Sequence, residues 1–262
     1  MLTPGLVSIT FRRLVPREII DLVVRAGQCA IEWGGDVHVP HGDLARAREV
    51  KQMTLDAGLQ VASYGSYYHL GLQEPVPFET VLETAVFLGA PVIRVWAGKK
   101  GSAEADAEYR ARVVRDGQRS ADLAAQAGLE VALEFHRGTL TDTYTSARML
   151  LEEIGRPKMT SYWQPPVGAS VADCLEGIRA LLPWLRHVHV FHWDSTAKVR
   201  FPLAADESVW RQYLQAISLS GRNHFVLLEF VKDDAPEQYL EDAATLNEWL
   251  AAFNKQARPP IL

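Results

Sequence analysis

Four polar side chains in the second half of the chain could together bind one divalent cation. Glu134, Gln164, His189 and Glu229 each lie near the end of a short β-rich run. Alternation along the strand places Glu134, His189 and Glu229 on the side opposite the apolar residues. Two carboxylates in an interior need a compensating charge, which a divalent cation would supply. Oxygen ligands with one imidazole suit Mn²⁺ first, with Mg²⁺, Co²⁺ or Zn²⁺ as alternatives.

A second set of residues could bind substrate around this cation. They close the predicted strands and are aromatic, basic or otherwise polar: Glu32, Tyr64, His69, Arg94, Trp96, His136, Trp163, His192 and Trp193. Aromatic faces can stack on the C–H faces of sugars and exclude water from a site. Three other readings stay open: Glu32 could orient a substrate hydroxyl or a histidine behind the metal ligands, Arg94 could pair with a glutamate, and the aromatic rings could fill space.

These side chains require a regular series of elements to bring them together. Apolar stretches with helical spacing end in glycine at Gly27, Gly58 and Gly89, and a β-rich run follows each of them. The predicted strands are 6–11, 30–33, 60–64, 92–96, 130–135, 160–164, 187–191 and 225–230. Short strands that alternate with helices are typical of parallel βαβ units.

Eight such alternations in 262 residues predict an α/β fold, a single-domain (β/α)8 TIM barrel over residues 1–262. An open doubly wound sheet usually carries a glycine fingerprint after its first strand. This chain has Arg12, Arg13 and Leu14 there instead. In a barrel the candidate residues would share the C-terminal end of the strands, where active sites form.

Composition and charge exclude several classes of protein. With 48% apolar and 23% charged residues the chain is not a disordered or fibrous protein. A net charge of −5 argues against general binding of nucleic acid or of anionic membranes. Cys29 and Cys174 match no metal or redox spacing, which is typical of a cytoplasmic protein. The sequence shows neither a secretory signal nor a membrane-spanning run.

The segments LEFHRGTLTD around Glu134, HVHVFHW around His189 and LLEF around Glu229 resemble the xylose isomerase-like TIM-barrel superfamily, the sugar phosphate isomerase and epimerase group. The resemblance spans essentially the whole chain. It implies that Glu134, His189 and Glu229 hold one divalent metal ion. Gln164 stands where the family has an aspartate. A histidine that ketose epimerases carry just after it has no match near Val167, which disfavours ketose 3-epimerisation.

The resemblance and the residues together predict a metal-dependent isomerase or epimerase. The substrate would be a small sugar, a sugar phosphate or a keto-polyol. Glu134 and Glu229 would act as base and acid while they ligate the metal, and the metal would stabilise an enediolate. The same apparatus could perform a lyase-type dehydration.

Two other functions remain open for this barrel. An apurinic-site endonuclease would need more ligands, for which His38, His41 and His69 are candidates, and a basic DNA face. A non-catalytic sugar-binding protein is compatible with the uncharged Gln164. The tail 256–262 could reach a neighbouring subunit of a homo-oligomer.

Overall fold

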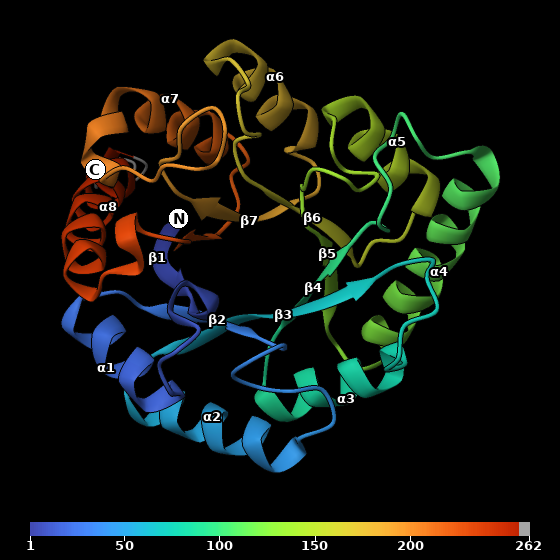
Figure 1. Ribbon diagram of the computed structural model, residues 1–262, viewed down its shortest axis with the longest axis horizontal. Helices are drawn as coiled ribbons and strands as arrows, with labels where there is room; N and C mark the ends of the chain where they lie inside the picture. The colour runs from blue at the N-terminus through green and yellow to red at the C-terminus, as the bar shows by residue number, and fades with distance from the viewer. Residues whose placement is uncertain (257–262) are drawn as a thin grey trace, which may run out of the picture.

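Eight parallel strands close into a barrel, and a ring of helices surrounds it (Figure 1). The computed structural model describes residues 1–256. The strands are β1 (Leu2–Val7), β2 (Ala30–Gly34), β3 (Gln60–His69), β4 (Val92–Trp96), β5 (Glu130–Leu133), β6 (Met159–Trp163), β7 (Leu185–Val190) and β8 (His224–Leu228). The helices are α1 (Pro16–Arg25), α2 (Leu44–Asp56), α3 (Phe78–Leu88), α4 (Ala107–Gln126), α5 (Tyr144–Ile154), α6 (Val171–Leu181), α7 (Glu207–Ser218) and α8 (Pro236–Gln256). Each strand pairs with its neighbour in chain order and β8 pairs with β1, which confirms the predicted (β/α)8 barrel.

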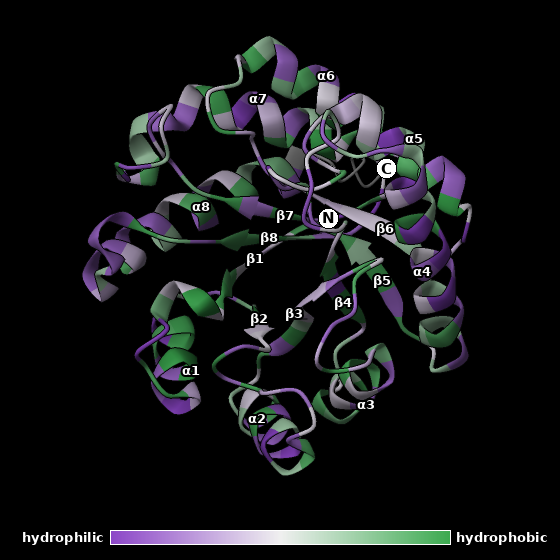
Figure 2. Ribbon diagram, turned by 45° about the vertical axis from the view of Figure 1, so that its right-hand side comes forward, coloured by the Kyte–Doolittle hydropathy of each residue, from purple (hydrophilic) through white to green (hydrophobic). Residues whose placement is uncertain are grey.

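Two apolar layers hold the barrel together. Mostly small side chains fill its interior, among them Ala30, Ala62 and Ala132, and the large ring of Tyr162 lies with them. A larger layer lies between the strands and the helices. Figure 2 shows the matching pattern on the helices, where hydrophobic and hydrophilic residues alternate around the ring. Alternate residues of each strand therefore face either the barrel axis or the helices.

Side-chain caps begin several of the helices. Asp43 and Asp106 each accept a hydrogen bond from a backbone N–H three residues later. Ser170 does the same at the start of α6, where its Oγ accepts a bond from the N–H of Asp173. Asp206 occupies the N-cap position of α7, but its side chain makes no capping hydrogen bond. These caps satisfy N–H groups that the first helical turn leaves unpaired.

The prediction for the first strand, 6–11, is wrong at both ends. β1 ends at Val7, and Ser8–Phe11 form a short 3-10 helix. Ser8 Oγ accepts a hydrogen bond from the N–H of Gly34 at 2.9 Å and shares one with Nδ1 of His38 at 2.9 Å. These bonds tie the chain to the end of β2 and the loop after it. The apolar pattern continues past Val7, so it gave no sign of this change.

Two buried histidines outside the cavity make stability depend on pH. Burial lowers the pKa of His38 and of His224. A folded-state pKa below the unfolded value of about 6.5 means that the unfolded chain takes up more protons on acidification. This contribution to stability is present above that pH and is lost as the pH falls through it.

We therefore expect the Tm from thermal unfolding to fall between about pH 7 and about pH 5. The fall should be smaller in His38→Asn, because one of the buried rings with a lowered pKa is then missing, while others such as His224 and His187 remain. The opposite result, a Tm that is level over this range, would mean that these rings take up protons equally well in the folded chain.

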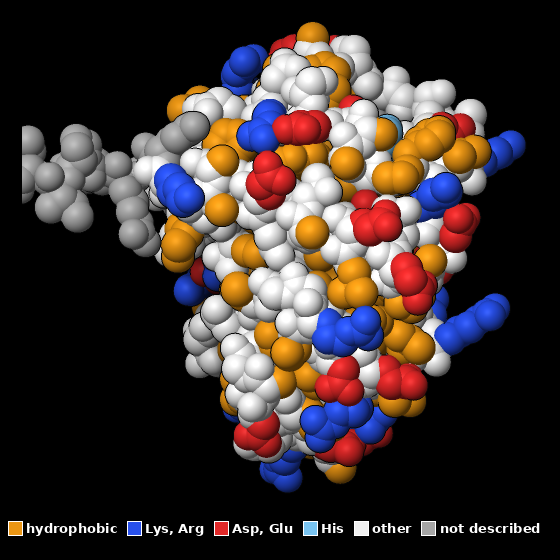
Figure 3. All heavy atoms as spheres, turned by 90° about the vertical axis from the view of Figure 1, so that its left-hand side faces the viewer, with side chains coloured by type: hydrophobic (Ala, Val, Ile, Leu, Met, Phe, Trp, Pro, Cys, Tyr) orange, Lys and Arg blue, Asp and Glu red, His pale blue; other side chains and the backbone are white. Residues whose placement is uncertain are grey.

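The outer surface mixes charges of both signs. On the face that carries α8 and α1, acidic and basic side chains are interspersed (Figure 3). Within residues 1–256, no helix combines the length and the apolar character that crossing a bilayer requires. The tail for which we expect a subunit contact lies, from residue 257 onward, outside the described residues.

Candidate metal centre and active site

A cavity of about 530 Å³ opens at the C-terminal ends of the strands. Carboxylates, guanidinium groups and aromatic rings from different strands line it. Seven of the predicted site residues are among them: Arg94, Trp96, Glu134, His136, Gln164, Trp193 and Glu229. This end of a (β/α)8 barrel is where active sites form, so the cavity lies where the sequence predicts it.

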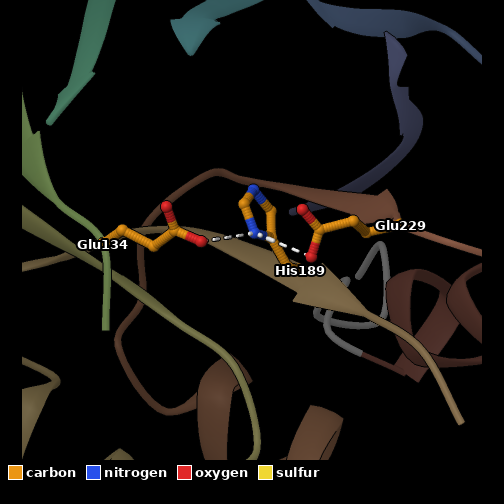
Figure 4. A group of neighbouring side chains, drawn as sticks. All are labelled: Glu134, His189 and Glu229. Carbon is orange, nitrogen blue, oxygen red and sulfur yellow. Dashed lines mark ion pairs between the residues drawn. The ribbon is translucent and has the colours of Figure 1, made fainter. Parts of the chain in front are cut away.

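Three of the four predicted metal ligands lie close together at this cavity (Figure 4). Glu134, His189 and Glu229 each offer one donor atom, and the three atoms lie within 4.8 Å of one another. His189 Nδ1 is 3.8 Å from Glu134 Oε1 and 3.5 Å from Glu229 Oε2. The glutamates directly follow β5 and β8, where their backbone N–H groups still bond to the carbonyls of Val95 and Val190. The barrel therefore fixes their positions.

The fourth predicted ligand, Gln164, lies beside them. It directly follows β6, and its Oε1 is 3.1 Å from His189 Nδ1. An amide oxygen can coordinate a hard cation but brings no charge. Two carboxylates, one imidazole and one amide oxygen make a donor set that fits a divalent cation.

The charges around this cluster also fit a divalent cation. Arg94 is buried, and it contacts Glu134 through Nη1 and Glu32 through Nε, the latter at 2.7 Å. Burial alone would raise the pKa of Glu32, but Arg94 and His189 outweigh it and hold that pKa well below its usual range. Burial would lower the pKa of Arg94, yet Glu32 keeps it high. Glu32, Glu134 and Glu229 with one arginine leave a formal charge of −2, which one divalent cation would neutralise.

The two oxygens of Glu134 have different partners. Arg94 Nη1 and Trp96 Nε1 both donate to Oε2. Oε1 is left facing His189. With Oε2 held by two donors and Oε1 turned toward His189, Glu134 is placed as a fixed ligand rather than as a side chain free to carry protons.

His136 presents a free ring nitrogen to the cavity. Its ring stacks on Trp96 with centroids 4.7 Å apart. Nδ1 lies 2.7 Å from the carbonyl oxygen of Arg137, which can only accept, so Nδ1 carries the proton. Burial lowers the pKa of His136. The neutral ring therefore has its lone pair on Nε2, as a general base requires.

The prediction that Tyr64 and Trp163 bind substrate is wrong. Both side chains are fully buried in the layer between strands and helices. Tyr64 donates a hydrogen bond to the carbonyl of Val39 at 2.7 Å. Trp163 packs edge-on against Trp210 of α7. Alternation along the strand decides this, since the neighbouring Tyr162 takes the position that faces the barrel axis.

Three further residues that were expected to bind substrate do not line this cavity. His69 pairs through Nδ1 with Glu74 at 2.8 Å. His192 donates from Nδ1 to the carbonyl of Pro202 at 3.1 Å and lines an adjoining cavity of about 310 Å³, which shares Phe191 and Trp193 with the first. Glu32 has no exposed surface. Their strand-end positions predict proximity to the site, but not the side of the strand that each occupies.

Other cavity residues had no signal in the sequence. Tyr67 and Phe230 adopt left-handed backbone conformations, with φ of 57° and 53°, and both line the cavity. Alternation along strand 8 predicts that Phe230 faces the helices, which is wrong because the positive φ interrupts the alternation. Non-glycine residues rarely adopt such a φ, so no pattern predicts it. Arg12 and Arg137 line the cavity from loops, where no periodicity applies.

The chain matches the description of a known family. A family profile for the xylose isomerase-like TIM barrel matches residues 20–249. The chain belongs to the xylose isomerase-like TIM barrel family. The family predicted from the segments around Glu134, His189 and Glu229 is thus confirmed.

Relatives in this family have different activities. The chain is 30% identical to a 3-dehydroshikimate dehydratase of Bacillus anthracis over 147 residues, which cover 51% of this chain and 50% of that protein. It thus spans about half the length of this curated relative. The solved structure of AsbF, a probable 3-DHS dehydratase of Bacillus anthracis, has a TM-score of 0.78 at 22% identity, covering 94% of this chain and 99% of that one. A D-psicose 3-epimerase has a TM-score of 0.70 at 17% identity, covering 95% and 97%.

A third similar structure contains a metal ion. It is a xylose isomerase-like TIM barrel protein from Mycobacterium smegmatis in complex with magnesium, with a TM-score of 0.72 at 15% identity, covering 95% of this chain and 97% of that one. At these identities the likeness of the solved structures shows the fold.

Proposed function

We propose that this protein is a divalent-metal-dependent dehydratase that removes a proton next to a carbonyl group and then expels water. One observation carries the proposal. Glu134 and Glu229, whose donor atoms cluster with that of the buried His189, line the same cavity as His136, whose Nε2 carries the lone pair. Such a cavity offers a cation site and a separate base, which are the two groups that this chemistry needs.

The chain's own residues divide the reaction between them. A cation bound by Glu134, Gln164, His189 and Glu229, with Mn²⁺ as the preferred ion, would polarise the substrate carbonyl and stabilise the charge that develops on its oxygen. His136 Nε2 takes the proton from the carbon next to the carbonyl. As the new C=C bond forms, the bond to the hydroxyl on the next carbon breaks. His136 returns its proton to that hydroxyl, so that water leaves and the ring is neutral again.

The arrangement of Glu134 favours dehydration over epimerisation. Inversion at a carbon needs proton carriers on both of its faces. Glu134 is held by Arg94 and Trp96, whereas an elimination needs only one base. The 30% identity to a 3-dehydroshikimate dehydratase also supports this choice. Arg12 and Arg137 line the cavity and favour an anionic substrate, such as a hydroxylated keto acid.

Isomerisation or epimerisation of a sugar is the second candidate. It is favoured by the two carboxylates on either side of His189 in Figure 4. Glu134 and Glu229 would then exchange protons with opposite faces of the substrate. Both candidates share the removal of a proton next to a carbonyl.

An apurinic-site endonuclease would need further metal ligands, and the histidines expected to supply them give this alternative little support. His38 bonds to Ser8, and His69 pairs with Glu74. Neither belongs to the cluster of Glu134, His189 and Glu229.

Removal of the metal is expected to abolish turnover, and Mn²⁺ is expected to restore it. The protein is stripped with a chelator, shown by elemental analysis to be metal-free, and assayed on 3-dehydroshikimate before and after Mn²⁺ is added. Dehydration is followed by the ultraviolet absorbance of the new conjugated double bond. Elemental analysis of the reloaded protein should give about one ion per chain.

A parallel assay separates the alternatives. Ketoses and aldoses are incubated with the protein in D₂O. Deuterium uptake into a sugar without loss of water would favour the isomerase. Tight sugar binding with neither reaction would favour a non-catalytic barrel. Full turnover in protein shown to be metal-free would contradict both enzymatic proposals.

A further inference from the structure

Glu32 is a buried charge that the proposed reaction does not use. It lies in β2 and has no exposed surface. Its Oε1 is 2.7 Å from Arg94 Nε and 3.5 Å from His189 Nε2, and its Oε2 accepts a hydrogen bond from Ser63 Oγ at 2.7 Å. A buried carboxylate is costly unless it is paired. Here the partners of Glu32 are Arg94 and His189, and both of them belong to the proposed metal site or contact one of its ligands.

The first of these is His189. A ring that gives the lone pair of Nδ1 to a cation must carry its proton on Nε2. That nitrogen is buried and has no hydrogen-bond partner among the described residues. The nearby Oε1 of Glu32 is placed to accept its proton. Carboxylates in this position fix the ring orientation and the tautomer of metal-bound histidines.

The second is Arg94. Its Nε is bonded to Glu32, while its Nη1 contacts Oε2 of Glu134. This contact leaves Oε1 of Glu134 facing the metal site. Oε1 of Glu32 therefore lies beside both His189 and Arg94. The orientation of His189 sets the position of its own Nδ1, and Arg94 sets that of Glu134 Oε1.

The backbone of β3 leaves room for this arrangement. A Cβ atom on Gly65 would lie 2.8 Å from Arg94 Nη2 and 3.0 Å from Glu32 Oε1. The first distance would force a neighbouring group to shift, and the second would be a tight contact. The absence of a side chain on Gly65 therefore lets the pair of Glu32 and Arg94 close.

Glu32 also balances the charge of Arg94. The formal charges of the two side chains cancel, which leaves Glu134 and Glu229 to neutralise a divalent cation. Without Glu32, the guanidinium would be an uncompensated positive charge in contact with a ligand of that cation.

We propose that Glu32 is a positioning residue that orients His189 and Arg94 together and so preorganises the metal site. The inference rests on the proposed function, since it assumes that the cluster binds a cation. It assigns Glu32 a role in metal affinity without any contact with the substrate.

The test is Mn²⁺ binding to the metal-free protein, measured by isothermal titration calorimetry. Glu32→Gln keeps the size of the side chain and removes its charge. We expect its Kd for Mn²⁺ to rise by about ten-fold to about a hundred-fold, the usual range for the loss of a partner behind a metal ligand. Asp242→Asn is the matched control. Asp242 is also a buried carboxylate, 3% exposed, but it bonds to Leu203 and Gln238 away from the site.

Asp242→Asn should bind Mn²⁺ as the wild type does even if its Tm is lower, so that loss of stability alone is ruled out as the cause. Wild-type affinity in folded Glu32→Gln overturns the inference. If Glu32→Gln does not fold, Ser63→Ala decides. It removes one bond to Glu32 and keeps the charge, so a rise in Kd supports the positioning role and an unchanged Kd overturns it. A wild-type protein that binds no Mn²⁺ would instead refute the proposed function itself.

Discussion

Glu229→Gln and Glu134→Gln are each expected to lower kcat by about a thousand-fold or more. Each change replaces one of the two carboxylates that lie near His189 Nδ1 with a neutral amide. The formal charge of the proposed ligands is thereby reduced from −2 to −1. The amide keeps the size of the side chain, so the barrel should remain folded. The measurements are kcat at saturating Mn²⁺, the Kd for Mn²⁺, and far-ultraviolet circular dichroism as the check on folding.

Glu248→Gln is the control for this pair, because Glu248 is an exposed glutamate on α8. It should retain the wild-type kcat and Kd. The two site variants should also differ from each other. Glu134→Gln disturbs Arg94 and Trp96 in addition to the metal, so its effect on kcat should be the larger. Wild-type turnover in both site variants would remove these carboxylates from the mechanism.

His136→Asn is expected to lower kcat by about a hundred-fold to about ten thousand-fold, the usual contribution of a positioned general base. The Kd for Mn²⁺ should stay at the wild-type value, since His136 is not one of the proposed ligands. This split between turnover and metal binding distinguishes a base from a ligand. It is measured by steady-state kinetics together with calorimetric titration of Mn²⁺.

His192→Asn is a closely matched control for His136→Asn. Both rings donate from Nδ1 to a backbone carbonyl, but His192 lines the other cavity. Its replacement should leave kcat unchanged. If His136→Asn turns over at the wild-type rate, Glu229 becomes the candidate base, and the isomerase alternative gains support.

The sequence predicts the barrel and the clustering of the proposed metal ligands because both depend on simple periodicity. Alternation along strands 5, 7 and 8 sends Glu134, His189 and Glu229 inward, and closure of the barrel brings them together. Gln164 follows the same rule on strand 6. The alternation is a local pattern within each strand. The four side chains come close together in space because the sheet closes into a barrel.

The walls of the cavity follow no such rule. Trp163 ends its strand as expected, whereas β3 continues past Tyr64 to His69, and both side chains face the helices. Tyr67 and Phe230 enter the cavity through left-handed backbone conformations that depend on the surrounding packing. The contact of Arg94 with Glu134 joins two strands and was foreseen only as one of several open possibilities. Which side chain meets which across the barrel is a tertiary property.

The anchoring of the two glutamates has an evolutionary consequence. Glu134 and Glu229 stand one residue beyond their strands and are tied by backbone bonds to the sheet, while Arg12 and Arg137 come from the loops above. Insertions or replacements in those loops can reshape what the cavity accepts without moving the groups that hold the ion. Substrate preference and metal binding are thus encoded in separable stretches of the gene, and one can diversify while the other is retained.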